Sequence, residues 1–205
     1  DTALVAGFSA GLQFVDVAPP KVLDFALSTV SNVSRPVELS VVGDLVVTTN
    51  GASDEPVLEV HELAGTSLLP VGASAEIGTG DLLVTRGGYA LVSGRSASNE
   101  IMMWLYDFSD PASPVLLAQR QVPSTVRGVA LYGDLVYFSI DGGGVQIADI
   151  GTLTTFENAG FEPTSNTIRD LYIRDNYVLA ASSPNQQQVG VNGLSVYDLS
   201  DPVEP

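Results

Sequence analysis

Residues 126–149 read VRGVALYGDLVYFSIDGGGVQIAD, and this stretch decides the fold. It holds three apolar runs, which are Val126–Tyr132, Leu135–Ile140 and Gly144–Asp149, separated by Gly133-Asp134 and Asp141-Gly142-Gly143. Glycine and, less readily, aspartate adopt the positive φ angles that tight hairpin turns need. The stretch therefore predicts three antiparallel strands, and we expect a fourth, weaker strand within Thr152–Gly160.

The turn and the strand that follows it recur at a regular interval. The copies of the turn are Gly43-Asp44, Gly87-Gly88, Gly133-Asp134 and Asp175-Asn176, which are 44, 46 and 42 residues apart. A second marker, an alternating strand that ends in an acidic residue, recurs with a similar period. Its acids are Asp16, Glu62, Asp107, Asp149 and Asp198. Several strands per unit and a period of about 40–50 residues are typical of β-propeller blades.

We therefore predict an all-β protein, a β-propeller of four-stranded antiparallel blades, with about 4.5 blades in this chain. The repeat region is 1–205, and its approximate repeats are 1–42 (partial), 43–86, 87–132, 133–174 and 175–205 (partial). Thr2–Ala6 aligns with the second strand of a blade, and Val203 lies just past a third strand. Because an open arc would expose unpaired sheet edges, we expect a larger ring, or partner chains that cover the edges.

The acids that end the alternating strands are interpreted as turn formers. An aspartate in this position accepts hydrogen bonds from the backbone N–H groups that follow it, and a nearby proline restricts the turn. Both features occur in Ser109-Asp110-Pro111 and in Ser200-Asp201-Pro202, which follow Asp107 and Asp198. These carboxylates are therefore expected to serve the fold rather than a ligand.

Composition restricts the classes of partner. The 205 residues are 45% hydrophobic, which is ample for a core, and the formal net charge is −16. An acidic surface repels phosphate backbones, so we predict no nucleic-acid partner. No apolar run reaches the roughly 18–20 residues that a membrane span needs, so we predict no membrane insertion. The chain has no cysteine, which excludes disulfides and thiolate metal sites.

The strand-and-turn stretches resemble the blades of the LVIVD family of β-propeller repeats. The family pattern Gly-Leu-x-Val-x-Asp-hydrophobic-Ser-Asp-Pro-x-x-Pro is matched by Gly193–Pro205, which reads GLSVYDLSDPVEP, and nearly matched by Trp104–Pro114. Gly11–Val17 and Gly144–Ile150 keep the strand but lose Asp-Pro, and Leu58–Leu63 is the most degenerate copy. The resemblance implies a bacterial or archaeal protein that is secreted or displayed on the cell surface. It implies no shared activity and carries no catalytic motif.

No set of residues predicts catalysis or a metal centre. His61, the only histidine, is flanked by Glu59 and Glu62 and is interpreted as a solvent-facing strand residue rather than a ligand. A hydrolase triad would need His61 as its base, and no Gly-x-Ser-x-Gly elbow accompanies it. Asn50–Glu55 and Asp141–Gly144 offer oxygen ligands for calcium, but neither has acids at the alternate positions of a calcium loop. We predict no cofactor, and calcium is the alternative.

The candidate ligand-binding residues lie in loops expected on one face of the propeller. Loops between second and third strands contain Asp54, Arg95, Asp141 and the glutamine-rich stretch Asn185–Gln188. Loops that enter the first strand contain Arg127 and Arg169, which are 42 residues apart and therefore equivalent. Such guanidinium groups bind anionic ligands in bidentate fashion, so we predict Arg95, Arg127, Arg169 and Asp141 as the site. The alternative is that the arginines pair with acids such as Asp81 or Asp170.

One aromatic stretch has two interpretations. Trp104, Tyr106 and Phe108 alternate in the sequence, so they are expected to share one face of a strand. They either pack against the neighbouring blade or form a ridge that stacks on sugars or binds a protein.

Three functions remain open on the sequence. The leading hypothesis is a non-catalytic extracellular or cell-surface scaffold that mediates protein or glycan binding. The second is an enzyme domain of polysaccharide lyase or hydrolase type that uses carboxylates and arginines at the channel mouth, which the fold alone does not establish. The third is a structural subunit of an extended assembly, in which neighbouring copies cover the sheet edges.

Overall fold

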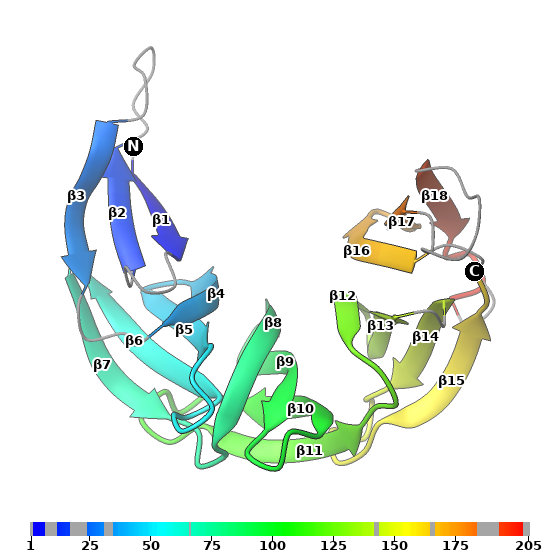
Figure 1. Ribbon diagram of the computed structural model, residues 1–205, viewed down its shortest axis with the longest axis horizontal. Helices are drawn as coiled ribbons and strands as arrows, with labels where there is room; N and C mark the ends of the chain where they lie inside the picture. Colours follow the sequence, from blue (N-terminus) through cyan, green and yellow to red (C-terminus); the bar gives the residue numbers. More distant parts are fainter. Residues whose placement is uncertain are drawn as a thin grey trace. The chain divides into compact units, whose positions relative to one another are not determined.

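The described part of the chain is built from β-strands. The computed structural model describes residues 2–6, 12–16, 24–30, 35–65, 67–141, 144–164, 167–183 and 193–202, and only the backbone of the first three segments. Eighteen strands in these segments form five sheets (Figure 1). In each sheet, every strand is hydrogen-bonded to its neighbour in the chain.

Within the described residues, three sheets have four strands and two have three. The first four-stranded sheet consists of β4 (Pro36–Val42), β5 (Leu45–Asn50), β6 (Leu58–Ala64) and β7 (Ser67–Ala73). The second consists of β8 (Gly78–Arg86), β9 (Tyr89–Ser96), β10 (Ile101–Asp107) and β11 (Val115–Gln121). The third consists of β12 (Val126–Tyr132), β13 (Leu135–Ile140), β14 (Gly144–Asp149) and β15 (Glu157–Glu162). The three-stranded sheets are β1 (Thr2–Ala6), β2 (Leu12–Asp16) and β3 (Asp24–Val30); and β16 (Thr167–Arg174), β17 (Tyr177–Ser183) and β18 (Gly193–Asp198).

The strands of residues 126–149 confirm the prediction residue for residue, because β12, β13 and β14 have the expected bounds. They pair antiparallel in the order of the chain. The fourth strand, β15, spans Glu157–Glu162, so it begins within the expected stretch Thr152–Gly160 and ends two residues beyond it. It begins late in that stretch because a turn follows β14, in which Leu153 has a φ of 57°. The extended backbone of a strand cannot include such a residue.

The turns that define the repeat have the expected backbone conformation. Gly43, Gly87 and Gly133 have φ values of 63°, 58° and 56°. The fourth copy has Asp175 at this place, with a φ of 53°. Aspartate tolerates the left-handed region better than most residues, so the same hairpin closes without glycine.

The chain divides into two compact units. The first comprises Asp1–Glu100 with Tyr106–Leu116, and the second comprises Ile101–Leu105 with Leu117–Pro205. In the first unit, β4 and β5 contact β8, and in the second unit, β12, β13 and β14 contact β16. In each unit, therefore, the first strand of one sheet packs against the sheet that precedes it in the chain.

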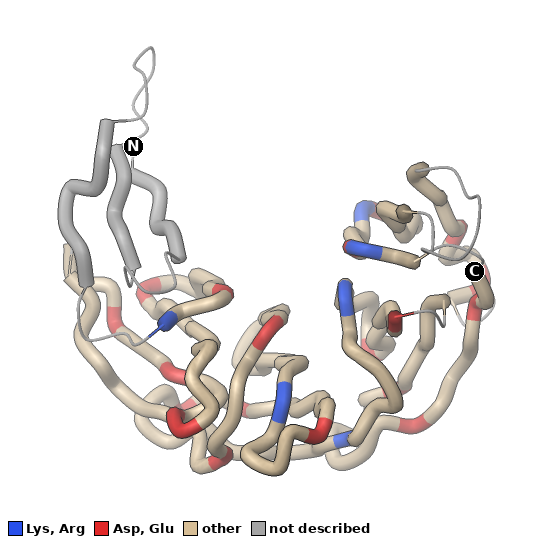
Figure 2. Tube along the Cα trace, viewed as in Figure 1, with Lys and Arg blue, Asp and Glu red and all other residues tan. Residues whose placement is uncertain are grey.

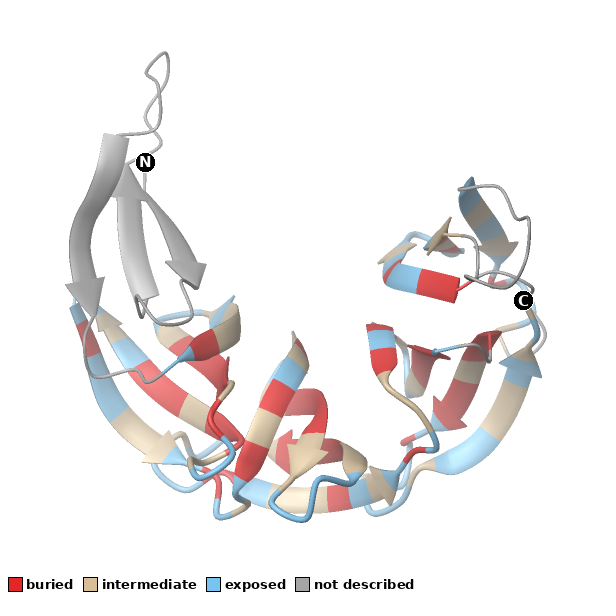
Figure 3. Ribbon diagram, in the orientation of Figure 1, coloured by how far each residue is buried: buried red, intermediate tan, exposed pale blue. Residues whose placement is uncertain are grey.

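Burial is greatest in the second and third strands of the four-stranded sheets (Figure 3). In β5, Val46 and Val47 are fully buried although they are consecutive, and Tyr137 and Phe138 in β13 behave in the same way. Consecutive residues point to opposite faces of a strand. These strands are therefore covered on both faces, which explains their continuous apolar runs.

One hydrophobic cluster joins two sheets of the second unit. Ala130, Tyr137, Val145 and Ile147 of the β12–β15 sheet and Ile168, Leu171, Val178 and Ala180 of the β16–β18 sheet belong to it. The hydroxyl of Tyr137 donates a hydrogen bond to the carbonyl of Pro202, in the Asp-Pro stretch after β18. Burial, assisted by Tyr132 and Asp201, raises the pKa of Tyr137 to about 12. The hydroxyl therefore stays protonated, and remains a donor, at neutral pH.

The acids that end the third strands form turns, as predicted. The Oδ1 atom of Asp149 accepts a hydrogen bond of 2.6 Å from the backbone N–H of Gly151. Equivalent bonds join Asp107 to Ser109 at 2.8 Å and Asp198 to Ser200 at 2.9 Å. In three repeats, therefore, the third strand ends in a turn in which the aspartate accepts a hydrogen bond from the N–H group two residues later.

Replacing Asp149 with alanine is expected to lower the free energy of unfolding by about 1 kcal/mol, because the N–H of Gly151 loses its acceptor. Asp149→Asn keeps an acceptor oxygen and is the matched control, with a smaller loss. Urea denaturation followed by circular dichroism measures both. Equal losses in the two variants would contradict the role of the hydrogen bond.

Candidate ligand-binding site

The structure brings two of the predicted site residues together. Arg127, near the start of β12, places its Nη2 atom 2.9 Å from Oδ2 of Asp141, which follows β13. Arg127 therefore pairs with an acid, as the alternative interpretation expected, but the acid is Asp141 rather than Asp81 or Asp170. The side chains are 40% and 38% exposed, and such surface pairs contribute about 0–1 kcal/mol.

The equivalent arginine of the next repeat makes the equivalent contact. Nε of Arg169 donates to Oγ of Ser183 at 2.7 Å, and Ser183 follows Asp141 by the same 42 residues. Arg95 approaches Oδ1 of Asn99 at 3.5 Å. The three predicted arginines therefore each have a local partner on their own hairpin. The predicted stretch Asn185–Gln188, like Gly142 and Gly143, lies outside the described residues.

The interpretation of His61 as solvent-facing is wrong. The side chain lies in β6 and is only 1% exposed. Its Nε2 atom is 3.4 Å from Oε2 of Glu59 and 3.4 Å from Oγ1 of Thr48. Alternation within β6 correctly gives opposite faces to His61 and Val60, but both faces are covered, since Val60 is also fully buried.

The aromatic stretch belongs to the core. Trp104 and Tyr106 lie in β10, Phe108 follows that strand, and all three are at most 2% exposed. Burial raises the pKa of Tyr106, and the nearby carboxylate of Glu76 adds to the effect. These rings are therefore buried and form no exposed ridge, as the packing interpretation expected.

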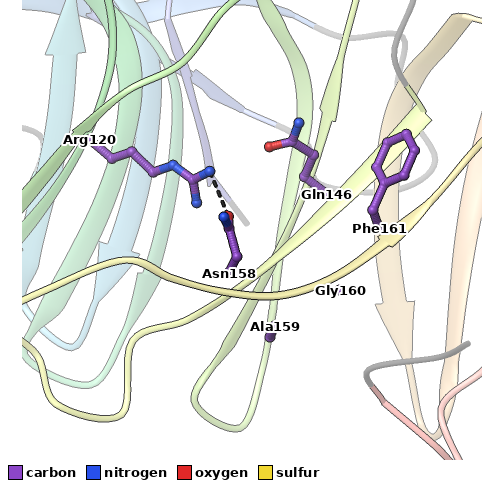
Figure 4. Close-up of a pocket in the computed structure, with 6 residues that line it drawn as sticks. All are labelled: Arg120, Gln146, Asn158, Ala159, Gly160 and Phe161. Carbon is purple, nitrogen blue, oxygen red and sulfur yellow. Dashed lines mark hydrogen bonds between the residues drawn. The ribbon is translucent and has the colours of Figure 1, made fainter.

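A crevice opens between the edge strands β11 and β15 in the second unit (Figure 4). Its volume is about 490 Å³, which is within the range of small-molecule sites. Its lining consists of Arg120 from β11, Gln146 from β14 and Asn158, Ala159, Gly160 and Phe161 from β15. Sequence reasoning did not identify this site.

Two neighbours hold the guanidinium group of Arg120. Its Nη2 atom donates a hydrogen bond of 2.7 Å to Oδ1 of Asn158 (Figure 4). Its Cζ atom lies 5.8 Å from the centroid of the Phe138 ring, a cation–π distance. Because Phe138 is fully buried, Arg120 rests on a rigid base and its orientation is restricted.

A β-bulge determines which side chains of β15 reach the crevice. In the ladder, Phe161 is opposite Gln146 and Asn158 is opposite Ala148, with an irregularity between Ile147 and Ala148. Side chains three positions apart normally point to opposite faces of a strand, and one extra residue reverses that relation. The bulge at Ala159 therefore places Asn158 and Phe161 on the same face.

The crevice combines hydrogen-bonding groups with an accessible aromatic ring. Asn158 and Gln146 each supply an amide with a donor and an acceptor, and Arg120 supplies further donors. Phe161 is 53% exposed, although it faces the same side as the buried Phe138. Such a surface suits non-covalent recognition of a polar group that has an apolar side.

The described residues lack two kinds of feature. They contain no cluster of three or more His, Asp or Glu side chains able to hold a metal ion. No helix in the described segments is long and apolar enough to cross a membrane. Acidic residues are distributed along the trace of both units, and the fewer basic residues are scattered among them (Figure 2).

Comparisons with known proteins establish the fold. No family model and no curated protein matches the sequence. The crystal structure of the computationally designed Ika8 protein has a TM-score of 0.71 and 10% identity, covering 99% of this chain and 57% of that one. U3-55K has a TM-score of 0.71 and 13% identity, covering 96% of this chain and 64% of that one. For Sqt1 from Chaetomium thermophilum the TM-score is 0.69 and the identity 15%, covering 99% of this chain and 54% of that one.

This chain thus spans between about half and two thirds of the length of these structures. At such low identity, the likeness concerns the fold alone. Together with sheets that succeed one another at the period of the repeat, it leads to one conclusion: the chain is an all-β protein with the β-propeller fold, built from antiparallel blades.

Proposed function

We propose that this chain is a non-catalytic β-propeller scaffold of the LVIVD type, extracellular or on the cell surface, that mediates protein or glycan binding. The observation that carries the binding role is the crevice between β11 and β15, which Arg120, Asn158 and Phe161 line and in which Asn158 and Phe138 orient the guanidinium group of Arg120. Sites built on strands keep their geometry better than sites on loops. The location and the family rest on the resemblance of the strand-and-turn stretches.

The chemistry of the crevice favours a neutral glycan. A sugar ring has an apolar face that can lie against Phe161, and its hydroxyl groups can exchange hydrogen bonds with Gln146 and Asn158. Arg120 adds donors at the side of the crevice. The net charge of −16 disfavours a polyanionic glycan, so we expect uncharged hexose units. A protein partner is the alternative occupant.

Binding to an array of neutral oligosaccharides, followed by calorimetry on the best ligand, tests the proposal. Arg120→Ala and Phe161→Ala are each expected to weaken binding by about tenfold or more, which corresponds to about 1.4 kcal/mol. Because the scaffold performs no chemistry, the oligosaccharide should be recovered uncleaved after long incubation.

Arg174→Ala is the matched control. It removes the same charge from a side chain that is 78% exposed and lies outside the crevice. The affinity of this variant for the oligosaccharide should therefore equal that of the unmodified protein. An array without any ligand, or equal affinities for all three variants, would exclude the crevice as a glycan site. If a purified protein partner binds this chain and Arg120→Ala weakens that binding, the crevice is assigned to that partner.

A further inference from the structure

The hydrogen bond between Arg120 and Asn158 determines which end of the Asn158 amide a ligand meets. A guanidinium group can only donate hydrogen bonds, so the atom 2.7 Å from Nη2 of Arg120 has to be the carbonyl oxygen Oδ1. The amide nitrogen Nδ2, which also only donates, is left for a ligand. Arg120 and Asn158 therefore both offer N–H groups to the occupant of the crevice.

Among the side chains that line the crevice, donors outnumber acceptors. The residues described in its lining include no aspartate or glutamate, and the side-chain acceptors are Oε1 of Gln146 and the second lone pair of Oδ1 of Asn158. A sugar hydroxyl group both donates and accepts, so it uses only part of this donor set. A carbonyl oxygen accepts two hydrogen bonds and donates none, so it matches these donors better.

The acceptor has to lie beside an apolar group. In the strand ladders, Gln146 is opposite Phe138 on one side and Phe161 on the other, so these three side chains form a row across one face of the sheet. Phe138 is fully buried, whereas Phe161 is 53% exposed and accessible to a ligand. Because the Cβ atoms of opposite residues are about 5 Å apart, the matching group joins an acceptor to an apolar carbon over a similar distance.

A carboxylate is the other group that would engage these donors, and it fits the crevice less well. It has no apolar side to set against Phe161. The net charge of −16 repels a glycan that carries a carboxylate on each unit. The charge of Arg120 also interacts already with the Phe138 ring, whose centroid is 5.8 Å from Cζ. These observations favour a neutral acceptor.

We propose that the crevice between β11 and β15 selects sugars that carry an acetamido group, the N-acetylhexosamines. This inference rests on the proposed glycan-binding function. The acetamido carbonyl oxygen accepts hydrogen bonds from Arg120 and Asn158, the acetamido N–H donates to Oε1 of Gln146, and the methyl group packs against Phe161. Each of the three parts of the group thus finds a partner among the lining residues.

Calorimetry with matched pairs of methyl β-glycosides tests the inference on the full-length protein. One pair is the N-acetylglucosaminide and the glucoside, and the other is the N-acetylgalactosaminide and the galactoside. The members of a pair differ only in the acetamido group, which replaces a hydroxyl group of the sugar. In at least one pair, we expect the acetamido member to bind at least about tenfold more tightly, because it adds a hydrogen bond and a buried methyl group.

Asn158→Asp separates the donor of this residue from its contact with Arg120. The aspartate keeps an acceptor for Arg120 but replaces the donor Nδ2 with a second acceptor oxygen. The affinity for the acetamido member should therefore fall at least about tenfold, and the affinity for the hydroxyl member should fall less, because a hydroxyl group can donate to the new oxygen. The side chain of Asn158 is exposed, so we expect the circular dichroism spectrum to be unchanged.

The outcomes distinguish this inference from the proposed function. If the array yields a neutral hexose ligand but neither pair shows an acetamido preference, glycan binding stands and the inference is overturned. Equal losses for both members of the preferred pair in Asn158→Asp, or tighter binding of a uronate glycoside than of either acetamido sugar, would also overturn it. If no neutral sugar binds at all, the proposed function itself fails, and the inference fails with it.

Discussion

Replacing Trp104 with alanine is expected to lower the free energy of unfolding by about 3–5 kcal/mol, the largest loss that we expect from a single truncation in this chain. Trp104 is 2% exposed in β10, and its neighbours Met103 and Leu105 are also buried. Truncation removes the buried indole and leaves a cavity that close-packed surroundings fill only in part.

Urea denaturation measured by circular dichroism gives the loss, because Trp104 is the only tryptophan and its removal also abolishes the intrinsic indole fluorescence. Trp104→Phe is the control, since it keeps an aromatic ring and should cost clearly less. A loss below about 1 kcal/mol for Trp104→Ala would mean that β10 does not lie in a packed core.

Replacing Gly128 with valine is expected to destabilise the protein by about 3 kcal/mol, because the new side chain has no space between two sheets. A Cβ atom on Gly128 would lie 2.7 Å from the backbone nitrogen of Leu171 and 2.8 Å from Cα of Asp170. These are backbone atoms of β16, so no side-chain rotation relieves the contact. The close approach of β12 to β16 depends on the missing side chain.

Gly151→Ala is the control for Gly128→Val. The nearest atom to a Cβ there is Oδ1 of Asp149 at 3.0 Å, the end of an exposed side chain that can move. Trp104 fluorescence during urea denaturation follows both variants. A midpoint for Gly128→Val as high as that of Gly151→Ala would show that β12 and β16 are not in the close contact described.

Turn chemistry explains why so much of the fold could be predicted. Gly133 and Asp175 adopt the positive φ that the repeat marker implied, and the strands between such turns have little freedom in length. His61 shows the limit of the same reasoning. Periodicity tells which residues share a face of a strand, but whether that face is covered depends on another sheet, and here it is covered.

The crevice could not be predicted for a related reason. It needs Arg120 of β11 beside Asn158 and Phe161 of β15, and the tertiary packing within the second unit determines that proximity. It also needs the bulge at Ala159, without which Asn158 would face away from Phe161. A one-residue irregularity has no distinct signature in a stretch as short and polar as β15. An arginine in a chain with so few basic residues is the one available signal.

The succession of strands within each sheet has a consequence for the history of the molecule. Every strand ladder that the structure describes closes within one stretch of about 45 residues, so each blade holds its own ladders, and side chains such as Tyr137 and Arg120 make the hydrogen bonds to the neighbouring blade. Duplication or loss of a gene segment of that length therefore adds or removes a blade without reassigning any strand. During synthesis, the ladders of one blade can form before the next blade has left the ribosome.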